Sequence, residues 1–253
     1  MERRVIEAVV RERRLRWLID KKFESAVRNQ TVRRIERRAK YILIGFDSGT
    51  AIVHLGMSGS LRMLAAGIPP CAHDHWDIVL DTGQVLRFHD PRRFGSLHWT
   101  RGDPLQHPLL AKLAPEPLSE AFDAEYLHRA TRKRSVAIKH LIMNSQLVVG
   151  VGNIYASEAL FRARISPRRA ARRITREESK ALVRAIKEVL TEAIEIGGTT
   201  LRDYVNAEGT PGYFAQRLYV YERSKQPCRV CKSPIRQFTQ GQRSTYWCAV
   251  CQR

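Results

Sequence analysis

The chain has 253 residues, and its 44 Lys and Arg outnumber its 25 Asp and Glu, so the formal net charge is +19. An excess of this size indicates a polyanionic partner, either a nucleic acid or an anionic membrane surface. We expect neither a membrane span nor a charged-then-apolar leader, because no apolar run approaches the required length, and we therefore favour nucleic acid. The apolar content of 43% is sufficient for a folded core and excludes a disordered basic tail.

The first hundred residues have the pattern of an all-β domain. Apolar runs separated by turns of the Asp-x-Gly type predict a first strand and two hairpins, at residues 5–10, 41–55 and 76–88. Short strands at this spacing are typical of a β-sandwich or barrel. The chain reaches its first strand almost at once, without a polar lead-in.

Two glycine-containing loops of this domain carry side chains suited to DNA. The string HLGMSGSL contains Met57, and DPRRFG contains Arg92, Arg93 and Phe94. An exposed apolar side chain beside arginines suits insertion into a base stack. By residue type alone, burial of Met57 and Phe94 in the core is the favoured alternative. Lys40, which follows two arginines, is either a phosphate contact or a solvated charge.

Helical signals follow a stretch that four prolines punctuate and that we interpret as a linker. Ser119 and Ser135 are each placed to cap a helix. Thr175 and Glu178 form a capping box before apolar residues at helical spacing, which run as far as Ile194. The glycine pair after that run predicts the end of the helix.

A glycine-rich turn lies between these helices, in the string LVVGVGNIYASE. Its glycines let backbone amides approach a ligand, and Asn153 is placed as the N-cap of the next helix. The free amides of a helix N-terminus form an anion site, here for a DNA phosphate. A packing corner between two helices explains the same pattern equally well.

Two CxxC pairs, separated by sixteen residues, close the chain: Cys228, Cys231, Cys248 and Cys251. This spacing is typical of a structural zinc ribbon, in which four thiolates leave no open position for a substrate. Two disulfides or free thiols are the alternatives. The basic residues between the pairs, Arg243 among them, suit a nucleic-acid backbone. The fifth cysteine, Cys71, stands alone and fits a reducing cytosol.

The strings RRAKY, HLGMSGSL, DPRRFG, VVGVGNIYASEALF, GGTT and PGYF occur in order before the four-cysteine ribbon. Together they resemble the bacterial formamidopyrimidine-DNA glycosylases, which remove oxidised purines such as 8-oxoguanine from duplex DNA. The resemblance runs from about Val5 to the C-terminus. It implies an α+β multidomain fold with a β-sandwich, a linker, a helix–two-turn–helix domain and a four-cysteine zinc ribbon, at residues 1–102, 103–118, 119–215 and 216–253.

The resemblance also implies roles for individual residues. Lys40 matches the family's lysine at the damage site. Met57, Arg92 and Phe94 match the trio that fills the gap left by an extruded base. Asn153 and Arg243 match the phosphate contacts beside the lesion. The stretch 199–221 matches the loop that covers the flipped base. We expect one structural zinc, a DNA duplex with oxidised bases as partner, a monomer, and a cytoplasmic, nucleoid-associated protein.

The start of the chain departs from the family pattern. Family members begin Met-Pro-Glu-Leu-Pro-Glu, and the amine of the exposed proline attacks C1′ of the damaged nucleotide. This chain begins Met1-Glu2-Arg3, and Val5 matches a point downstream of that segment. A misassigned start, a truncation and a catalytically silent paralogue give the same pattern.

Three functions therefore stay in view. We favour a DNA glycosylase with abasic-site lyase activity. A silent binder of damaged DNA is the second, and a zinc-containing transcription or translation factor is the third and least compatible with DPRRFG and GVGNIYASE.

Overall fold

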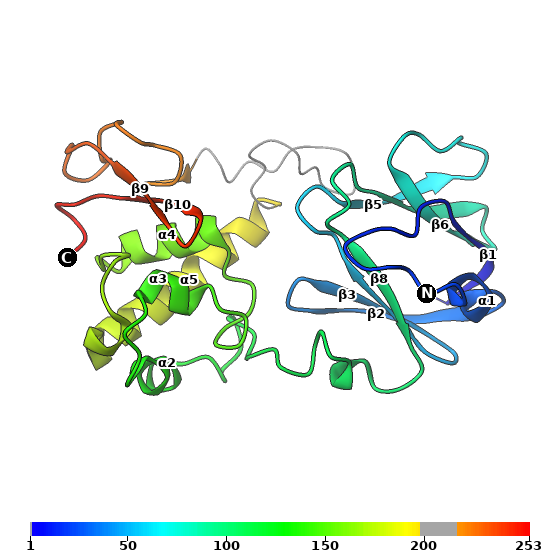
Figure 1. Ribbon diagram of the computed structural model, residues 1–253, viewed down its shortest axis with the longest axis horizontal. Helices are drawn as coiled ribbons and strands as arrows, with labels where there is room; N and C mark the ends of the chain where they lie inside the picture. Colours follow the sequence, from blue (N-terminus) through cyan, green and yellow to red (C-terminus); the bar gives the residue numbers. More distant parts are fainter. Residues whose placement is uncertain (1, 198–216) are drawn as a thin grey trace. The chain divides into compact units, whose positions relative to one another are not determined.

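The computed structural model describes residues 2–197 and 217–253 (Figure 1). They form two compact units, the first ending at Ala111 and the second beginning at Lys112. The finer division into domains, linker and ribbon stays a prediction. The stretch 199–221, expected to cover a flipped base, lies outside the described residues except for 217–221.

The first unit is built on eight antiparallel strands in the order β5-β7-β6-β1-β2-β3-β4-β8. Their bounds, with one short helix and one 3-10 turn, are β1 (Arg3–Val10), α1 (Phe23–Val27), β2 (Thr31–Arg38), β3 (Tyr41–Phe46), β4 (Thr50–His54), β5 (Ser60–Ala65), β6 (Asp74–Leu80), β7 (Gln84–His89), β8 (Ser96–Thr100) and η1 (Pro104–Gln106). The predicted first strand and both hairpins are confirmed.

Strand β1 belongs to both halves of this sheet. Arg3 and Arg4 pair with β2, and from Val5 to Val10 the strand pairs with β6, with an irregularity between Val5 and Glu7. A strand that changes partner in this way joins two layers at a corner. The core between the layers takes Phe46 from one half and Trp76 and Phe88 from the other, all fully or nearly buried. The predicted sandwich is therefore confirmed.

The second unit is helical, with a small hairpin at its end. Its elements are α2 (Ala124–Thr131), α3 (Ile138–Ile142), α4 (Asn153–Arg162), η2 (Ala171–Arg173), α5 (Arg176–Glu195), β9 (Arg236–Gln240) and β10 (Arg243–Trp247). An antiparallel sheet unit followed by a helical unit confirms the α+β class. No helix in the described ranges is long and apolar enough to cross a membrane.

The cap predictions were right for one helix and wrong for three. Thr175 and Glu178 make both bonds of a capping box at α5. Helix α2 begins later than expected and is capped by Asp123, because the hydroxyl of Ser119 donates instead to the carbonyl of Glu116 at 2.9 Å. The other corrections concern α3, which begins after Ala137 without a side-chain cap, and α4, whose N-cap is Gly152.

Helix α5 buries most of its predicted apolar face, but the last predicted residue of that face is exposed. Leu182, Ile186 and Val189 are buried, whereas Ile194 is 65% exposed in the last turn. The helix ends at Glu195, and Gly197 follows with φ +75, a left-handed conformation that glycine adopts without strain.

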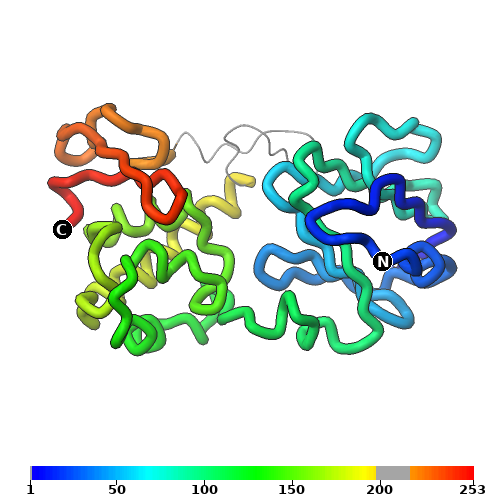
Figure 2. The backbone as a smooth tube through the Cα atoms, in the orientation of Figure 1, coloured from blue at the N-terminus to red at the C-terminus, as the bar shows by residue number. Residues whose placement is uncertain are grey.

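The C-terminal segment packs on α4 (Figures 1 and 2). Phe161 of α4, Val220 and Ile235 form a small apolar core, and the buried Cys228 and Cys248 complete it. A hairpin of ten strand residues has too little apolar surface to fold alone, so this packing and a metal must stabilise it.

Candidate nucleic-acid interface and metal centre

Lys40 lies on the tight turn between β2 and β3, where Ala39 has a φ of +54 and the lysine side chain is exposed. A pocket of about 350 Å³ opens beside it, and Tyr41, His54 and Met57 also line this pocket. The fold therefore brings Lys40 and Met57 together from two different turns. Burial, with Lys40 and Arg16 adding to it, lowers the pKa of His54, so the ring is neutral and its Nδ1 accepts the Gly56 amide at 2.9 Å.

The apolar side chains of the two loops point outward. Met57 is 63% exposed and Phe94 is 43% exposed, so the alternative that they belong to the core is wrong. The Arg92 guanidinium lies over the Phe94 ring, 4.8 Å from its centroid. Arg93 has a φ of +56, and its guanidinium pairs with Glu12 at 3.4 Å.

The backbones of the two loops touch. A Cβ added to Gly56 would lie 2.6 Å from the amide nitrogen of Gly95, and Gly56 itself has a φ of +73. A Cβ added to Gly95 would lie 2.8 Å from the carbonyl oxygen of His54. Glycine is thus required at both positions for the loops to approach each other, and this approach places Met57 and Phe94 on adjacent loops.

In the second unit, Asn153 and Arg243 meet at one place. The Asn153 side-chain amide donates to the Ser244 carbonyl at 3.0 Å and to the Tyr221 hydroxyl at 3.3 Å. Its Oδ1 is buried and has no partner within the described residues. Arg243 starts β10 next to Ser244 and is exposed. Three kinds of group therefore surround this corner: the backbone amides of the first turn of α4, the exposed guanidinium of Arg243 and the Oδ1 atom of Asn153.

Three buried charges that hold these parts were missed from the sequence: Asp90, Lys139 and Glu158. The Lys139 ammonium of α3 donates to the Thr245 hydroxyl at 2.7 Å, and burial, followed by Arg243, lowers its pKa to about 8. The Glu158 carboxylate of α4 accepts three consecutive backbone amides, those of residues 219–221, at 2.8 to 2.9 Å. For Lys139 and Glu158 the sequence signal was a charged residue on an apolar helix face, and a solvated charge gives the same pattern. Asp90 lies on a loop, where the sequence gives no signal of burial.

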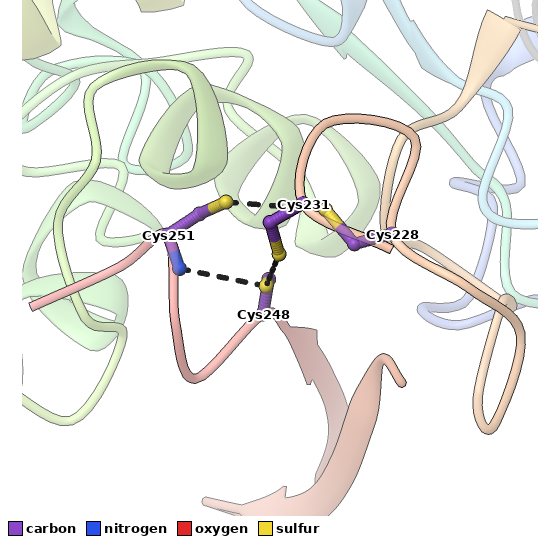
Figure 3. A group of neighbouring side chains, drawn as sticks. All are labelled: Cys228, Cys231, Cys248 and Cys251. Atoms are coloured by element: carbon purple, nitrogen blue, oxygen red, sulfur yellow. Dashed lines mark hydrogen bonds between the residues drawn. The ribbon is translucent and has the colours of Figure 1, made fainter. Parts of the chain in front are cut away.

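The four cysteines of the ribbon converge (Figure 3). Their sulfur atoms all lie within 4.8 Å of one another, and two of the pairs are 4.0 and 3.4 Å apart. Four sulfurs at about 2.3 Å from a zinc ion lie about 3.8 Å from one another, whereas a disulfide would be about 2.05 Å long. No disulfide joins any two of the four. The residues present therefore fit a closed, four-coordinate zinc site, and the disulfide alternative is excluded.

Comparison with known proteins matches three family models along the chain. They are the formamidopyrimidine-DNA glycosylase N-terminal domain at residues 1–97, the formamidopyrimidine-DNA glycosylase H2TH domain at 113–205, and the zinc finger found in FPG and IleRS at 225–253. The formamidopyrimidine-DNA glycosylase of Thioalkalivibrio sulfidiphilus is 56% identical over 251 residues, which cover 99% of this chain and 93% of that protein. The chain belongs to the formamidopyrimidine-DNA glycosylase family.

Solved structures of glycosylases in this family have the same fold. The MutM (Fpg) protein of Thermus thermophilus superposes with a TM-score of 0.88 at 38% identity, over 100% of this chain and 92% of that one. The complex of Lactococcus lactis Fpg (MutM) with Fapy-dG containing DNA gives 0.90 at 27% identity, over 99% and 93%. The family resemblance and the fold class are confirmed, and the four cysteines form the structural zinc site of this family's ribbon.

Proposed function

We propose that this chain is a base-excision repair DNA glycosylase with abasic-site lyase activity, which removes oxidised purines, 8-oxoguanine and formamidopyrimidines, from duplex DNA. Its relatives carry the glycosylase name, and the Lactococcus lactis neighbour holds Fapy-dG containing DNA. The observation that carries the proposal is the pair of exposed apolar side chains, Met57 and Phe94, on adjacent loops beside the Lys40 pocket. Single exposed apolar residues are common, but exposed apolar side chains grouped together and rimmed by polar residues mark an interaction site.

The first unit supplies the contacts at the lesion. Met57, Phe94 and Arg92 enter the space that an extruded base leaves, because a flat ring with a cation stacked on it replaces base stacking well. Lys40 contacts the damaged nucleotide or its phosphate from the neighbouring pocket. Arg93, next to Arg92, lies within reach of the DNA backbone.

The second unit supplies contacts to the phosphates. Arg243 and the α4 amides beside Asn153 hold phosphates on either side of the damage, and zinc folds the hairpin that presents Arg243. When bound, zinc supplies structural stability alone, because four thiolates leave no open coordination position. The partner is double-stranded DNA, and we place the protein as a monomer on nucleoid DNA in the cytoplasm, consistent with the net charge of +19.

In the covalent step an uncharged amine attacks C1′, the bond from C1′ to the base breaks and the base leaves with a proton. Opening of the C1′–O4′ bond then leaves an iminium ion between the amine and C1′. In the family this amine is that of an N-terminal proline. A free α-amine has a pKa of about 7.7 to 8.0, so far more of it is neutral at physiological pH than of a lysine with a pKa of about 10.4. We therefore propose that the residues described above bind damaged duplex and that excision uses an N-terminal α-amine and not the side chain of a lysine.

Single-turnover excision tests this function. The chain preceded by a relative's N-terminal segment should release 8-oxoguanine from a duplex, whereas a polypeptide of residues 1–253 assayed without such a segment should do so very slowly. An extended chain that binds both duplexes tightly but excises neither 8-oxoguanine nor formamidopyrimidine would overturn the proposal.

A further inference from the structure

A single buried carboxylate contacts both loops that carry the exposed apolar side chains. Asp90 is 0% exposed. Its Oδ1 accepts the Ser58 hydroxyl at 2.7 Å, and its Oδ2 accepts the Gly95 amide at 2.7 Å. Ser58 directly follows Met57, and Gly95 directly follows Phe94. One side chain therefore fixes the residue adjacent to each of the two side chains proposed to enter the base stack.

Asp90 is itself held against the sheet. The ring of His75, on β6, donates from Nε2 to the Asp90 carbonyl at 2.7 Å. The Asp90 amide donates to the His73 carbonyl at 3.0 Å, and the Arg93 amide donates to the Asp90 carbonyl at 3.2 Å. Because His75 is only 3% exposed, this anchor belongs to the rigid part of the sandwich. The sheet thus holds the carboxylate in place, and both loops are hydrogen-bonded to it.

We propose that Asp90 is a positioning residue for lesion recognition, which holds Met57 and Phe94 at a fixed separation through Ser58 and Gly95. Two independent loops would each lose conformational freedom on entering the duplex, and a preformed pair avoids that cost. A carboxylate suits this place because it accepts only, and both oxygens here face donors. The inference rests on the proposed function, in which these two side chains occupy one gap.

Ser58→Ala separates positioning from folding, because it removes only the bond from Asp90 to the Met57 loop. The probe is a pair of matched duplexes, one with a tetrahydrofuran abasic-site analogue and one undamaged. We expect the preference for the abasic duplex to fall about tenfold, the typical effect of losing one hydrogen bond to a charged group. Binding to the undamaged duplex should stay unchanged, and 2-aminopurine beside the abasic site should fluoresce less, since fewer bases are unstacked.

Ser60→Ala is the matched control. The Ser60 hydroxyl is also buried, two residues further along, and it has no hydrogen-bond partner within the described residues. Removal of that hydroxyl should leave both affinities at the wild-type values. Equal losses in Ser58→Ala and Ser60→Ala would show general loosening of the region and would overturn the inference.

Combination with Phe94→Ala tests whether Ser58 acts through the exposed side chains. If it does, Ser58→Ala should have no further effect once Phe94 is absent, because there is no second side chain to position. Effects that multiply, or a Ser58→Ala variant that keeps its full preference, would contradict the proposal. A wild-type protein that binds damaged and undamaged duplex equally would instead refute the proposed function. Failure of the inference and failure of the proposed function are therefore distinguishable.

Substitution of Asp90 itself gives a further check. Asn can accept the Gly95 amide with its oxygen while its amide donates to the Ser58 hydroxyl. It gives up only the longer bond from the Arg92 amide to Oδ1, at 3.3 Å, so Asp90→Asn should keep most of the lesion preference. Asp90→Ala loses all three of these bonds, including those to both loops, and should lose the preference. An Asp90→Asn variant as poor as Asp90→Ala, although its melting temperature is that of the wild type, would exclude a hydrogen-bonded tie.

Discussion

At the scale of single side chains, Met57 and Phe94 show that residue type alone does not predict burial. Met and Phe are most often buried, and composition alone favours the core for both. The structure exposes both side chains on two loops whose backbones touch at Gly56 and Gly95, so closely that neither glycine has room for a Cβ. The family resemblance predicted their role, whereas the physical reason for their exposure depends on contacts between residues about 40 apart.

Phe94→Ala should reduce the preference for lesion-bearing duplex by about tenfold or more, because the ring fills the space of an extruded base. Affinity for undamaged duplex and the melting temperature should change little, since the ring is 43% exposed and contributes little to the core. Competition binding with matched duplexes measures both. A variant with undiminished lesion preference would remove this loop from the interface.

Arg243→Ala should weaken binding to damaged and undamaged duplex by the same factor. A phosphate contact carries no information about the base, and the loss of one such contact should reduce the slope of log affinity against log salt by about 1. Titrations at several salt concentrations give this slope. A selective loss on damaged duplex would instead place Arg243 at the base.

At the scale of secondary-structure elements, local patterns predicted what local interactions determine. The hairpins and the capping box of α5 were predicted correctly, since their turn residues and caps act within a few positions. The cap at Ser119 was wrong because its hydroxyl donates to a nearby carbonyl, a competing bond that sequence does not rank. The cap at Ser135 was wrong because α3 begins only after Ala137. Lys139 and Glu158 were missed for a different reason: their partners lie 61 to 106 residues away.

Cys248→Ser should unfold the ribbon locally and leave the β-sandwich folded. The site loses one of four thiolates, and the hairpin has no other source of comparable stability. We expect less than one bound zinc per chain, faster proteolysis of residues 228–253 and weaker DNA binding. Full zinc occupancy in this variant would show that the four cysteines are not the ligand set.

Lys139 should make the packing of the hairpin on α3 depend on pH. Burial lowers its pKa in the folded protein to about 8, below the ordinary 10.5, so the unfolded chain binds more protons between these values. Stability from this group therefore rises as pH rises from about 8 to 10.5, by up to about 1 kcal/mol per pH unit. In Lys139→Met this contribution should be absent. The free energy of unfolding of both proteins, measured from about pH 7 to 10, checks this, and parallel curves would contradict it.

At the scale of the whole molecule, charge and domain content point to the same partner. The net charge of +19 is spread over a sandwich, a helical domain and a zinc ribbon, each carrying candidate DNA contacts. We expect log affinity to fall against log salt with a slope of about −3 or steeper, because Lys40, Arg93 and Arg243 each replace counterions at phosphates. Anisotropy titrations across salt concentrations give the slope, and a slope near zero would exclude an electrostatic grip.

Borohydride trapping on an 8-oxoguanine duplex tests the central claim most directly, since hydride reduces the iminium ion and leaves a stable bond between the enzyme amine and C1′. The assay compares the printed chain with the chain preceded by a relative's segment that begins Pro-Glu after removal of methionine. We predict efficient trapping by the extended chain and little by the printed one. Efficient trapping by the printed chain, abolished by Lys40→Ala, would show that the lysine is the nucleophile. No trapping by either version would contradict the assignment as a glycosylase with lyase activity.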